Sequence, residues 1–388
     1  MWTILRNQPF KAIYLSYVWS SLLLFKLPVY SVLYLVPYFR PRASWTYGRA
    51  LFVRVFSTVF VASFNTLSLG LFRQDPRKLA KEADKLGLVW IDAAPELAIG
   101  DVKKYAEINK VEPAQVAGYW YGTRDPETGL AGQPAGPDEK VGDASPKGVN
   151  GLLPAEMAKY LPPFSRVLSL EYRLSQGPPL PIVDPFPAAL MDATAAYAYL
   201  VRTLGFKPSN ILVAGESAGG NLAVALGRFL VMYRDVLPRE LAPPGGLFLM
   251  SPTGDWGTTH ERGTMQRNQG TDWVQGFVAG YCSGAICGHL GRQEAETNAW
   301  ISPASRGLPV VQGLFKGLPP TLIQLGEGEM MLDQMRTLKD RMKADMGDDM
   351  VKYVEMKDGT HILLALPWHE EEKKAVYQEV REWARSVF

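Results

Sequence analysis

Ser217 lies in a segment whose residue types favour nucleophilic chemistry. Apolar residues 211–213 run directly into the pentapeptide GESAG at 215–219, and residues that favour a helix follow. This G-x-S-x-G arrangement between a strand and a helix is typical of a nucleophile elbow, a sharp turn that holds a serine hydroxyl at the edge of a sheet. The glycines at both ends of the pentapeptide would allow the close packing that such a turn needs. The alternative is an ordinary glycine-rich turn, because short G-x-S-x-G runs also occur by chance.

A serine hydroxyl is a poor nucleophile unless a base takes its proton. The chain has only four histidines, His260, His289, His361 and His369. His361 follows a predicted strand at 351–355, where a loop histidine can reach the same sheet edge, so it is the predicted base; the alternative is a loop histidine that is only hydrogen-bonded. His260 and His289 come before the strand expected to carry the acid, outside the order serine, acid, histidine. His369 begins the charged segment HEEEKK, and we expect it to be solvated.

A triad also needs an acid that accepts the imidazole N–H and stabilises the imidazolium. The turn after a predicted strand at 321–325 offers two carboxylates, Glu329 and Asp333. Glu329 lies in the turn itself, whereas Asp333 falls four residues later, inside the next predicted helix and directed away. Glu329 is therefore the predicted acid and Asp333 the alternative, with a role as a surface helix cap if it is not the acid.

Short apolar strands alternate with amphipathic helices through most of the chain. The predicted strands are residues 115–121, 166–174, 211–213, 246–250, 321–325 and 351–355. A helix is expected from Asp75-Pro76 to Gly87, and another with apolar positions from 376 to 387. This alternation predicts an α/β fold with a mostly parallel sheet covered by helices on both faces. Catalytic side chains would then gather at the carboxyl ends of the strands.

The N-terminal part of the chain differs from the rest. Residues 12–39 are apolar with a single charge, Lys26, and tyrosines and tryptophans lie near both ends of this run; a second apolar run at 51–72 is interrupted only by Arg54. About 20 apolar residues suffice to cross a bilayer. We expect membrane attachment, single-pass or peripheral. The alternative is that both runs form helices that cap an apolar substrate pocket.

The overall composition excludes some classes of function. The 388 residues carry 41 basic and 39 acidic side chains, a net charge of +2, so nothing in the charge favours binding to nucleic acid. Cys282 and Cys287, with His289 nearby, are too few for a metal site without further ligands, and an incidental pair of thiols is expected instead.

As an ordered set, several motifs resemble the hormone-sensitive-lipase-like branch of the α/β-hydrolases, and within it the fungal steryl acetyl hydrolases. The motifs are GESAGG, Glu171-Tyr172-Arg173-Leu174, Phe186-Pro187-Ala188 with Asp192, Ser251-Pro252, and the turn at 326–333. The resemblance covers roughly residues 75–385. It implies cleavage of carboxylic esters of apolar alcohols without a cofactor, in a membrane location such as the endoplasmic reticulum. It also implies that the Ala218 N–H forms part of an oxyanion hole.

We therefore expect an anchor or cap at 1–74 and an α/β-hydrolase domain at 75–388. Within that domain, an insert at 255–317 would form a lid over the substrate. Its aromatic residues Trp256, Trp273 and Phe277 are the expected lining of a pocket for an apolar alcohol such as a sterol or terpenoid. The oligomeric state is left open by the sequence.

One departure from this family concerns the middle of the sheet. The family usually has a strand that ends in His-Gly-Gly-Gly and supplies most of the oxyanion hole, but here Val141 is followed directly by Gly142-Asp143-Ala144. A segment of about ten residues, one strand and its loop, is expected to be missing at this point. With such a loss, the chain would be either a truncated variant of an active esterase or a weakly active copy of one. The rival functions are a non-catalytic, membrane-associated binding protein, or an acyltransferase that uses the same triad.

Overall fold

A central sheet organises the chain, and the computed structural model describes all residues except 1–2, 67–75, 127, 145–151, 162–163 and 275–276. Within the described residues the strand order is β1-β2-β4-β3-β5-β6-β7-β8. The strands are β1 (Leu88–Ile91), β2 (Val116–Gly122), β3 (Lys140–Ala144), β4 (Phe164–Glu171), β5 (Ile211–Glu216), β6 (Gly246–Met250), β7 (Thr321–Gly326) and β8 (Val351–Met356). β2 is antiparallel to both of its neighbours, and the other pairs are parallel. The predicted fold class is confirmed.

Helices precede, connect and follow these strands. They are α4 (Ala83–Leu86), α5 (Gly100–Asn109), α6 (Leu152–Tyr160), α7 (Ala188–Ala198), α8 (Ala218–Met232), α9 (Thr264–Arg267), α10 (Phe277–Cys287), α11 (Glu294–Thr297), α12 (Leu332–Met346) and α13 (Glu370–Val387). The helix expected before Gly87 is a 3-10 helix, Pro76–Glu82, that continues into α4; Asp75 lies outside the described residues, as does the expected domain boundary at 74/75.

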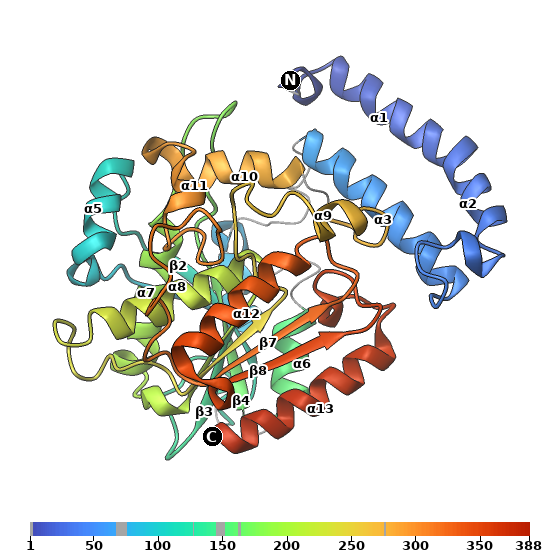
Figure 1. The fold of residues 1–388 in the computed structure, drawn as a ribbon. Coiled ribbons are helices and arrows are strands. Elements are labelled where there is room, and N and C mark those ends of the chain that lie inside the picture. Colours follow the sequence, from blue (N-terminus) through green and yellow to red (C-terminus); the bar gives the residue numbers. More distant parts are fainter. Residues whose placement is uncertain (1–2, 67–75, 127, 145–151, 162–163, 275–276) are drawn as a thin grey trace.

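The central strands are buried on both faces because helices cover each side of the sheet (Figure 1). Ile211 and Val213 of β5 pack into a cluster with α7, α8 and α12, while Leu212 and Ala214 pack on the other side with α6 and α13. Successive side chains of a strand point to opposite faces, so an unbroken apolar run fits a strand that is covered twice. These two clusters hold the strand ends, and thus the site, in place.

The expectation of a missing middle strand is wrong. β3 lies between β4 and β5 and is parallel to both. Val141 and Gly142 stand opposite Ile211 and Leu212 of β5, and the register with β4 shifts between Lys140 and Val141. Strand pairing depends on backbone N–H and C=O groups, so the residues that follow Val141 can complete the sheet without the family's usual sequence. The sheet is therefore continuous through its centre.

β4 ends earlier than the predicted strand at 166–174. It stops at Glu171, and the N–H of Arg173 donates to Asp192 Oδ2 at 2.8 Å instead of to a neighbouring strand. The Arg173 guanidinium also donates to Asp192 Oδ1 at 2.8 Å. Asp192 is on α7 and almost fully buried, so this ion pair fixes the chain that leaves β4 against the next helix.

Both apolar N-terminal runs form helices. Phe10–Leu33 is one continuous helix, composed of α1 (Phe10–Ser21), a π-helical turn (Leu22–Lys26) and α2 (Leu27–Leu33). α3 (Tyr47–Asn65) follows, and residues 67–72 of the second predicted run lie outside the described residues. Figure 1 shows α1 and α2 away from the body of the protein, with α3 between them and that body. Both helices are long and apolar enough to cross a membrane by length and composition.

Candidate active site

Ser217 occupies the sharp turn between β5 and α8. Its backbone has φ 51° and ψ −116°, a conformation that non-glycine residues rarely adopt. A Cβ on Gly215 would lie 2.1 Å from the Gly219 carbonyl oxygen, so only glycine allows the strand and helix to approach this closely. The strained turn places the Ser217 hydroxyl at the carboxyl end of the strand, as a nucleophile elbow requires.

Three of the side chains singled out from the sequence meet at this point. The Ser217 Oγ lies 3.0 Å from His361 Nε2, and His361 Nδ1 lies 2.8 Å from Glu329 Oε2. The carboxylate of Glu329 accepts the Nδ1–H, which leaves Nε2 free to accept the serine proton. Both Glu329 and His361 are buried. This is the geometry of a serine–histidine–carboxylate triad.

The other oxygen of Glu329 is also fully engaged. Its Oε1 accepts hydrogen bonds from Ser251 Oγ at 2.7 Å and from the Gly326 N–H at 2.6 Å. Asp333, the alternative acid, lies on α12, and its Oδ2 instead accepts from the Thr264 N–H at 2.9 Å. The structure therefore brings Glu329, and not Asp333, to the imidazole.

The turn that carries the acid and the turn that carries the base are in direct contact. We call residues 326–329 the acid turn and residues 357–361 the base turn. The Gly328 N–H donates to the Gly359 carbonyl at 2.8 Å. A Cβ on Gly326 would lie 2.4 Å from the carbonyl carbon of Gly359, so the two backbones leave no space for a side chain. Backbone contacts thus set the distance between the two side chains.

Asp272, from the expected lid, was not predicted to belong to the site. It is buried, and its carboxylate accepts from the Met330 N–H at 2.9 Å and, more weakly, from the His361 N–H at 3.4 Å. Burial, and to a smaller extent the charge of Glu329, raise the pKa of Asp272 to about 6, and the charge of His361 opposes this shift. No motif surrounds Asp272 in the sequence, so only the fold reveals that it links the base turn to Met330, the residue that follows the acid turn.

A further carboxyl group, Glu216, lies beside the serine at the end of β5. It is buried, and its Oε2 has no hydrogen-bond partner within the part of the chain that the structure describes. Burial raises the pKa of Glu216 to about 7, while the charge of His361 acts in the opposite direction. A group with this pKa is partly uncharged at neutral pH, which limits the cost of leaving it unpaired.

The environment of His361 favours its charged form. Burial alone would lower the pKa of the imidazole, but the hydrogen bond and charge of Glu329, together with the charges of Asp272 and Glu216, outweigh this effect. The pKa of His361 therefore lies above its ordinary value of 6.5. A base that holds a proton more strongly is better suited to receive one from a serine hydroxyl.

The expectation that His369 is solvated is wrong. Its side chain is fully buried, and Nε2 lies 2.9 Å from the Thr360 hydroxyl. His369 precedes the charged residues of α13, but the chain folds back so that the ring packs against the base turn, and burial lowers its pKa. His260 pairs with Asp255 through Nδ1 at 2.7 Å, away from Ser217.

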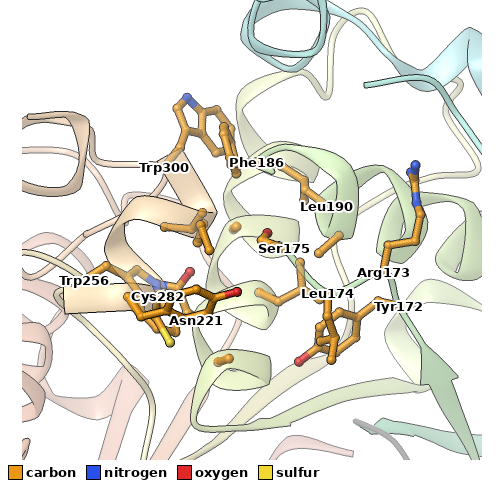
Figure 2. Close-up of a pocket in the computed structure, with 17 residues that line it drawn as sticks. Tyr172, Arg173, Leu174, Ser175, Phe186, Leu190, Asn221, Trp256, Cys282 and Trp300 are labelled. Carbon is orange, nitrogen blue, oxygen red and sulfur yellow. The ribbon is translucent and has the colours of Figure 1, made fainter. Parts of the chain in front are cut away.

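An apolar cavity of about 250 Å³ adjoins the elbow (Figure 2). It is lined by Tyr172, Arg173, Leu174, Ser175, Phe186, Ala189, Leu190, Ala218, Asn221, Leu222, Ala225, Trp256, Tyr281, Cys282, Ala285, Ile286 and Trp300. Ala218 opens α8, so its N–H has no acceptor inside the helix and is available at the cavity wall.

Only part of the expected pocket lining takes this position. Trp256 lines the cavity, but Trp273 does not; its indole N–H donates to the His361 carbonyl at 2.9 Å, behind the imidazole. An aromatic residue in an insert can pack beneath a turn as well as over a substrate, and Trp273 packs beneath the base turn. Phe277 is the first residue of α10, and its side chain is not among the described ones.

Cys282 and Cys287 are free thiols at and near this cavity. Burial raises the pKa of each to about 12, so neither is a thiolate at neutral pH. Among the residues that the structure describes, no group of three or more histidine, cysteine, aspartate or glutamate side chains is placed to hold a metal ion.

Residues 154–365 match a protein-family model described as the alpha/beta hydrolase fold. This match spans more than half of the chain, and the strand order and elbow agree with it, so the chain belongs to the α/β-hydrolase family. The resemblance to its hormone-sensitive-lipase-like branch is supported by a solved esterase of the bacterial hormone-sensitive lipase family. That structure is 27% identical, has a TM-score of 0.51, and covers 69% of this chain and 81% of its own.

Among curated proteins, the chain is similar to an esterase of Acinetobacter venetianus, 30% identical over 213 residues, which are 54% of this chain and 62% of the relative. An acetyl-hydrolase of Streptomyces hygroscopicus is 33% identical over 177 residues, 45% of this chain and 50% of the relative. The chain thus spans about half to less than two thirds of the length of these curated relatives. A solved esterase/lipase from an uncultured bacterium is 28% identical with a TM-score of 0.51, covering 69% of this chain and 82% of its own.

Proposed function

We propose that this protein is a serine carboxylesterase. The observation that carries the proposal is the chain of contacts from Ser217 through His361 to Glu329, next to an apolar cavity that reaches Ala218. The names of the similar proteins, an esterase and an acetyl-hydrolase, agree with this activity. The continuous middle strand removes the main argument for the rival function of a non-catalytic binding protein.

In this mechanism Ser217 Oγ attacks the ester carbonyl while His361 Nε2 takes the hydroxyl proton. The imidazolium then gives the proton to the leaving alcohol, and Glu329 stabilises its positive charge. A water molecule, deprotonated by the same imidazole, cleaves the acyl-enzyme and releases the acid. Each proton taken by the imidazole is returned within one cycle, so the protein ends as it began.

The negative charge on the tetrahedral intermediate needs hydrogen-bond donors. The Ala218 N–H is one, at the N-terminus of α8, where the helix dipole also favours an anion. In the sequence the peptide after β3 occupies the place of the family's His-Gly-Gly-Gly loop, and residues 145–151 lie outside the described residues. A single donor contributes roughly a hundredfold to a thousandfold to turnover in other hydrolases.

The lining of the cavity supports a proposal for the substrate class. Its lining is predominantly apolar, and Asn221, one of its polar residues, already donates to the Thr253 and Ile301 carbonyls at 2.9 Å each. Such a cavity favours an ester whose alcohol or acyl group is apolar. The resemblance to steryl acetyl hydrolases supports an acetyl ester of a sterol or terpenoid alcohol.

The direct test is hydrolysis of p-nitrophenyl acetate by the purified full chain, followed as release of nitrophenolate and of acid. Turnover well above the buffer rate supports the esterase. Binding of an apolar ester without turnover would contradict it and favour the binding protein.

Filling the cavity should change the preference for larger esters. We expect Cys282→Phe to raise KM for esters of bulky apolar alcohols, because the ring would occupy part of the cavity, while p-nitrophenyl acetate is cleaved at nearly the normal rate. The comparison is made from kcat/KM for a series of acetyl esters of increasing size. Cys282→Ser, which keeps the volume, is the matched control. Equal losses for small and large esters would show that the cavity does not hold the alcohol.

We also propose that the N-terminal part binds membranes, the endoplasmic reticulum being the location that the resemblance implies. Every charged side chain between residues 1 and 74 is basic. Large apolar side chains on the helix Phe10–Leu33, such as Ile13, Leu24 and Val32, are more than 60% exposed. An apolar helix with only basic charges matches a bilayer that contains anionic lipids.

Partition into vesicles tests this proposal. We expect the full chain to sediment with phosphatidylcholine vesicles, and more strongly when phosphatidylserine is added. Lys26→Ala should weaken binding to the anionic vesicles about fivefold, since each basic residue near the surface contributes roughly 1 kcal/mol. Lys207→Ala, a charge removed from an exposed position on the hydrolase body, is the control. Identical binding to vesicles with and without phosphatidylserine would refute the proposal that basic side chains attract the protein to anionic lipids.

A further inference from the structure

Residues 34–46, which connect the two apolar N-terminal helices, lie across the acid turn and the base turn. We call them the connecting segment. Arg42 Nη1 donates to Glu327 Oε2 at 2.9 Å and to Asp358 Oδ1 at 3.4 Å, and Arg42 Nη2 donates to the Glu327 carbonyl at 3.1 Å. Glu327 lies two residues before the proposed acid, and Asp358 three residues before the proposed base. One guanidinium therefore links the two turns.

A second contact comes from the same segment. The indole of Trp45 is almost completely buried, and its N–H donates to the Asp358 carbonyl at 3.0 Å. The segment is itself held in shape by Arg40, whose guanidinium donates to the Tyr34 carbonyl at 2.8 Å and the Trp45 carbonyl at 2.7 Å. The hydrogen bonds of Arg40 thus preorganise the segment that carries Arg42 and Trp45, the two donors to the base turn.

α3 supports the base turn from behind. The Trp273 ring lies against Phe56 and Phe60 of α3, with ring centroids 5.2 Å and 4.9 Å apart. The same indole donates to the His361 carbonyl at 2.9 Å, and its ring centroid is 5.6 Å from that of the imidazole. Phe56 and Phe60 of the N-terminal part therefore contact the proposed base through a single side chain, Trp273.

We propose that Arg42 is a positioning residue of the active site, and that the connecting segment joins the N-terminal helices to catalysis by holding the acid and base turns together. This proposal rests on the proposed function. Arg42 touches neither substrate nor reacting atoms, so it acts through the distance between Glu329 and His361. A misplacement of about 1 Å among reacting groups can cost on the order of a hundredfold in rate.

The expected signature is a loss of turnover without a loss of binding. Arg42→Ala should lower kcat of the full chain roughly tenfold to a hundredfold and leave KM nearly unchanged, because the cavity is not altered. Arg42→Lys should restore part of kcat, since an ammonium can reach one carboxylate but cannot span both turns. A residue with only a structural role would instead lower the amount of folded protein and leave the kcat of the remaining fraction unchanged.

Lys352→Ala provides the matched control. Lys352 lies near the start of β8, the strand whose other end leads into the base turn. Its ammonium pairs with the Glu379 carboxylate of α13 at 2.7 Å. Its removal deletes an ion pair of the hydrolase body and leaves kcat unchanged. Equal kcat in the wild type and Arg42→Ala, or equal kcat losses in Arg42→Ala and Lys352→Ala, would overturn the proposal.

A spectroscopic readout separates this proposal from the proposed function. The proton shared by His361 Nδ1 and Glu329 should give a downfield proton NMR signal, which Glu329→Gln would assign by abolishing it. We expect Arg42→Ala to shift or broaden this signal and Lys352→Ala to leave it in place. If the wild type hydrolyses no ester but Arg42→Ala moves the signal, the proposed function fails and the positioning role stands. An unmoved signal in Arg42→Ala would contradict the positioning role even in an active enzyme.

Discussion

Replacement of Ser217 by alanine is expected to lower kcat for p-nitrophenyl acetate by roughly a millionfold, as the loss of the nucleophile does in other serine hydrolases. Ser217 is the residue held in the strained turn at φ 51°, and its Oγ lies 3.0 Å from the imidazole that would take its proton. Alanine keeps the backbone and removes only the reacting atom. The fold and the cavity should therefore remain, and the melting temperature should change little.

Covalent labelling measures this effect without relying on residual turnover. A fluorophosphonate probe should label the wild type once per chain and fail to label Ser217→Ala. Ser209→Ala, which removes an exposed serine just before the same strand, should be labelled like the wild type. Labelling that persists in Ser217→Ala would remove this serine from the mechanism.

The second large effect is expected from Glu329→Gln, a loss of about ten-thousandfold in kcat. The amide can no longer stabilise the imidazolium, and its NH₂ group can stabilise the wrong tautomer of His361. Asp333→Asn should leave kcat nearly unchanged, because Asp333 accepts from the Thr264 N–H and does not reach the imidazole. Steady-state kinetics on the two variants decide between the two carboxylates. A larger loss in Asp333→Asn than in Glu329→Gln would reverse the assignment.

Comparison of Glu329→Gln with the wild type also gives a pH test. His361 must be uncharged to accept the serine proton, so kcat/KM should rise with pH through the pKa of His361 in the substrate-free enzyme. Because Glu329 helps to raise that pKa above 6.5, the wild-type midpoint should lie above 6.5. In Glu329→Gln the effect of burial, which lowers the pKa, is opposed less strongly, so the midpoint of the residual activity should move to lower pH. A midpoint that does not move would show that Glu329 does not set the basicity of His361.

Much of the site could be predicted from the sequence because its parts are local or ordered along the chain. The elbow is a continuous motif, and the order of strands places Glu329 and His361 after β7 and β8, whose carboxyl ends share an edge with β5. With four histidines to choose from, chain order excludes His260 and His289, and the position of His361 just after a predicted strand favours it over His369. The structure then brings these three side chains into hydrogen-bonding distance.

The errors concern contacts between segments that are distant in the sequence. Contacts that the sequence does not reveal are of the same kind: Asp272 and Trp273 come from an insert without a motif, and their positions beside the acid and base turns depend on how that insert folds back. The charged neighbours of His369 predict a solvated side chain, but its ring is covered by the base turn. The absence of the family's usual residues predicts a missing middle strand, but backbone pairing can be satisfied by many sequences.

Composition also could not show how the two apolar N-terminal runs differ. α1 and α2 leave most of their apolar side chains exposed, whereas Phe56 and Phe60 of α3 pack against Trp273. Both runs have similar hydropathy, and only the three-dimensional structure shows that one of them also braces the hydrolase body.

The packing of α3 has a practical consequence for anyone who shortens the chain to make it easier to handle. Beneath α3 lies an aromatic and aliphatic surface formed by Trp273, Ile362, Leu366 and Trp368. Cutting away the first 74 residues would remove both N-terminal helices and uncover this apolar surface, so the shortened protein would be prone to aggregate. Retaining the N-terminal helices in detergent is the better route to a monodisperse preparation, as large uncovered apolar patches drive self-association.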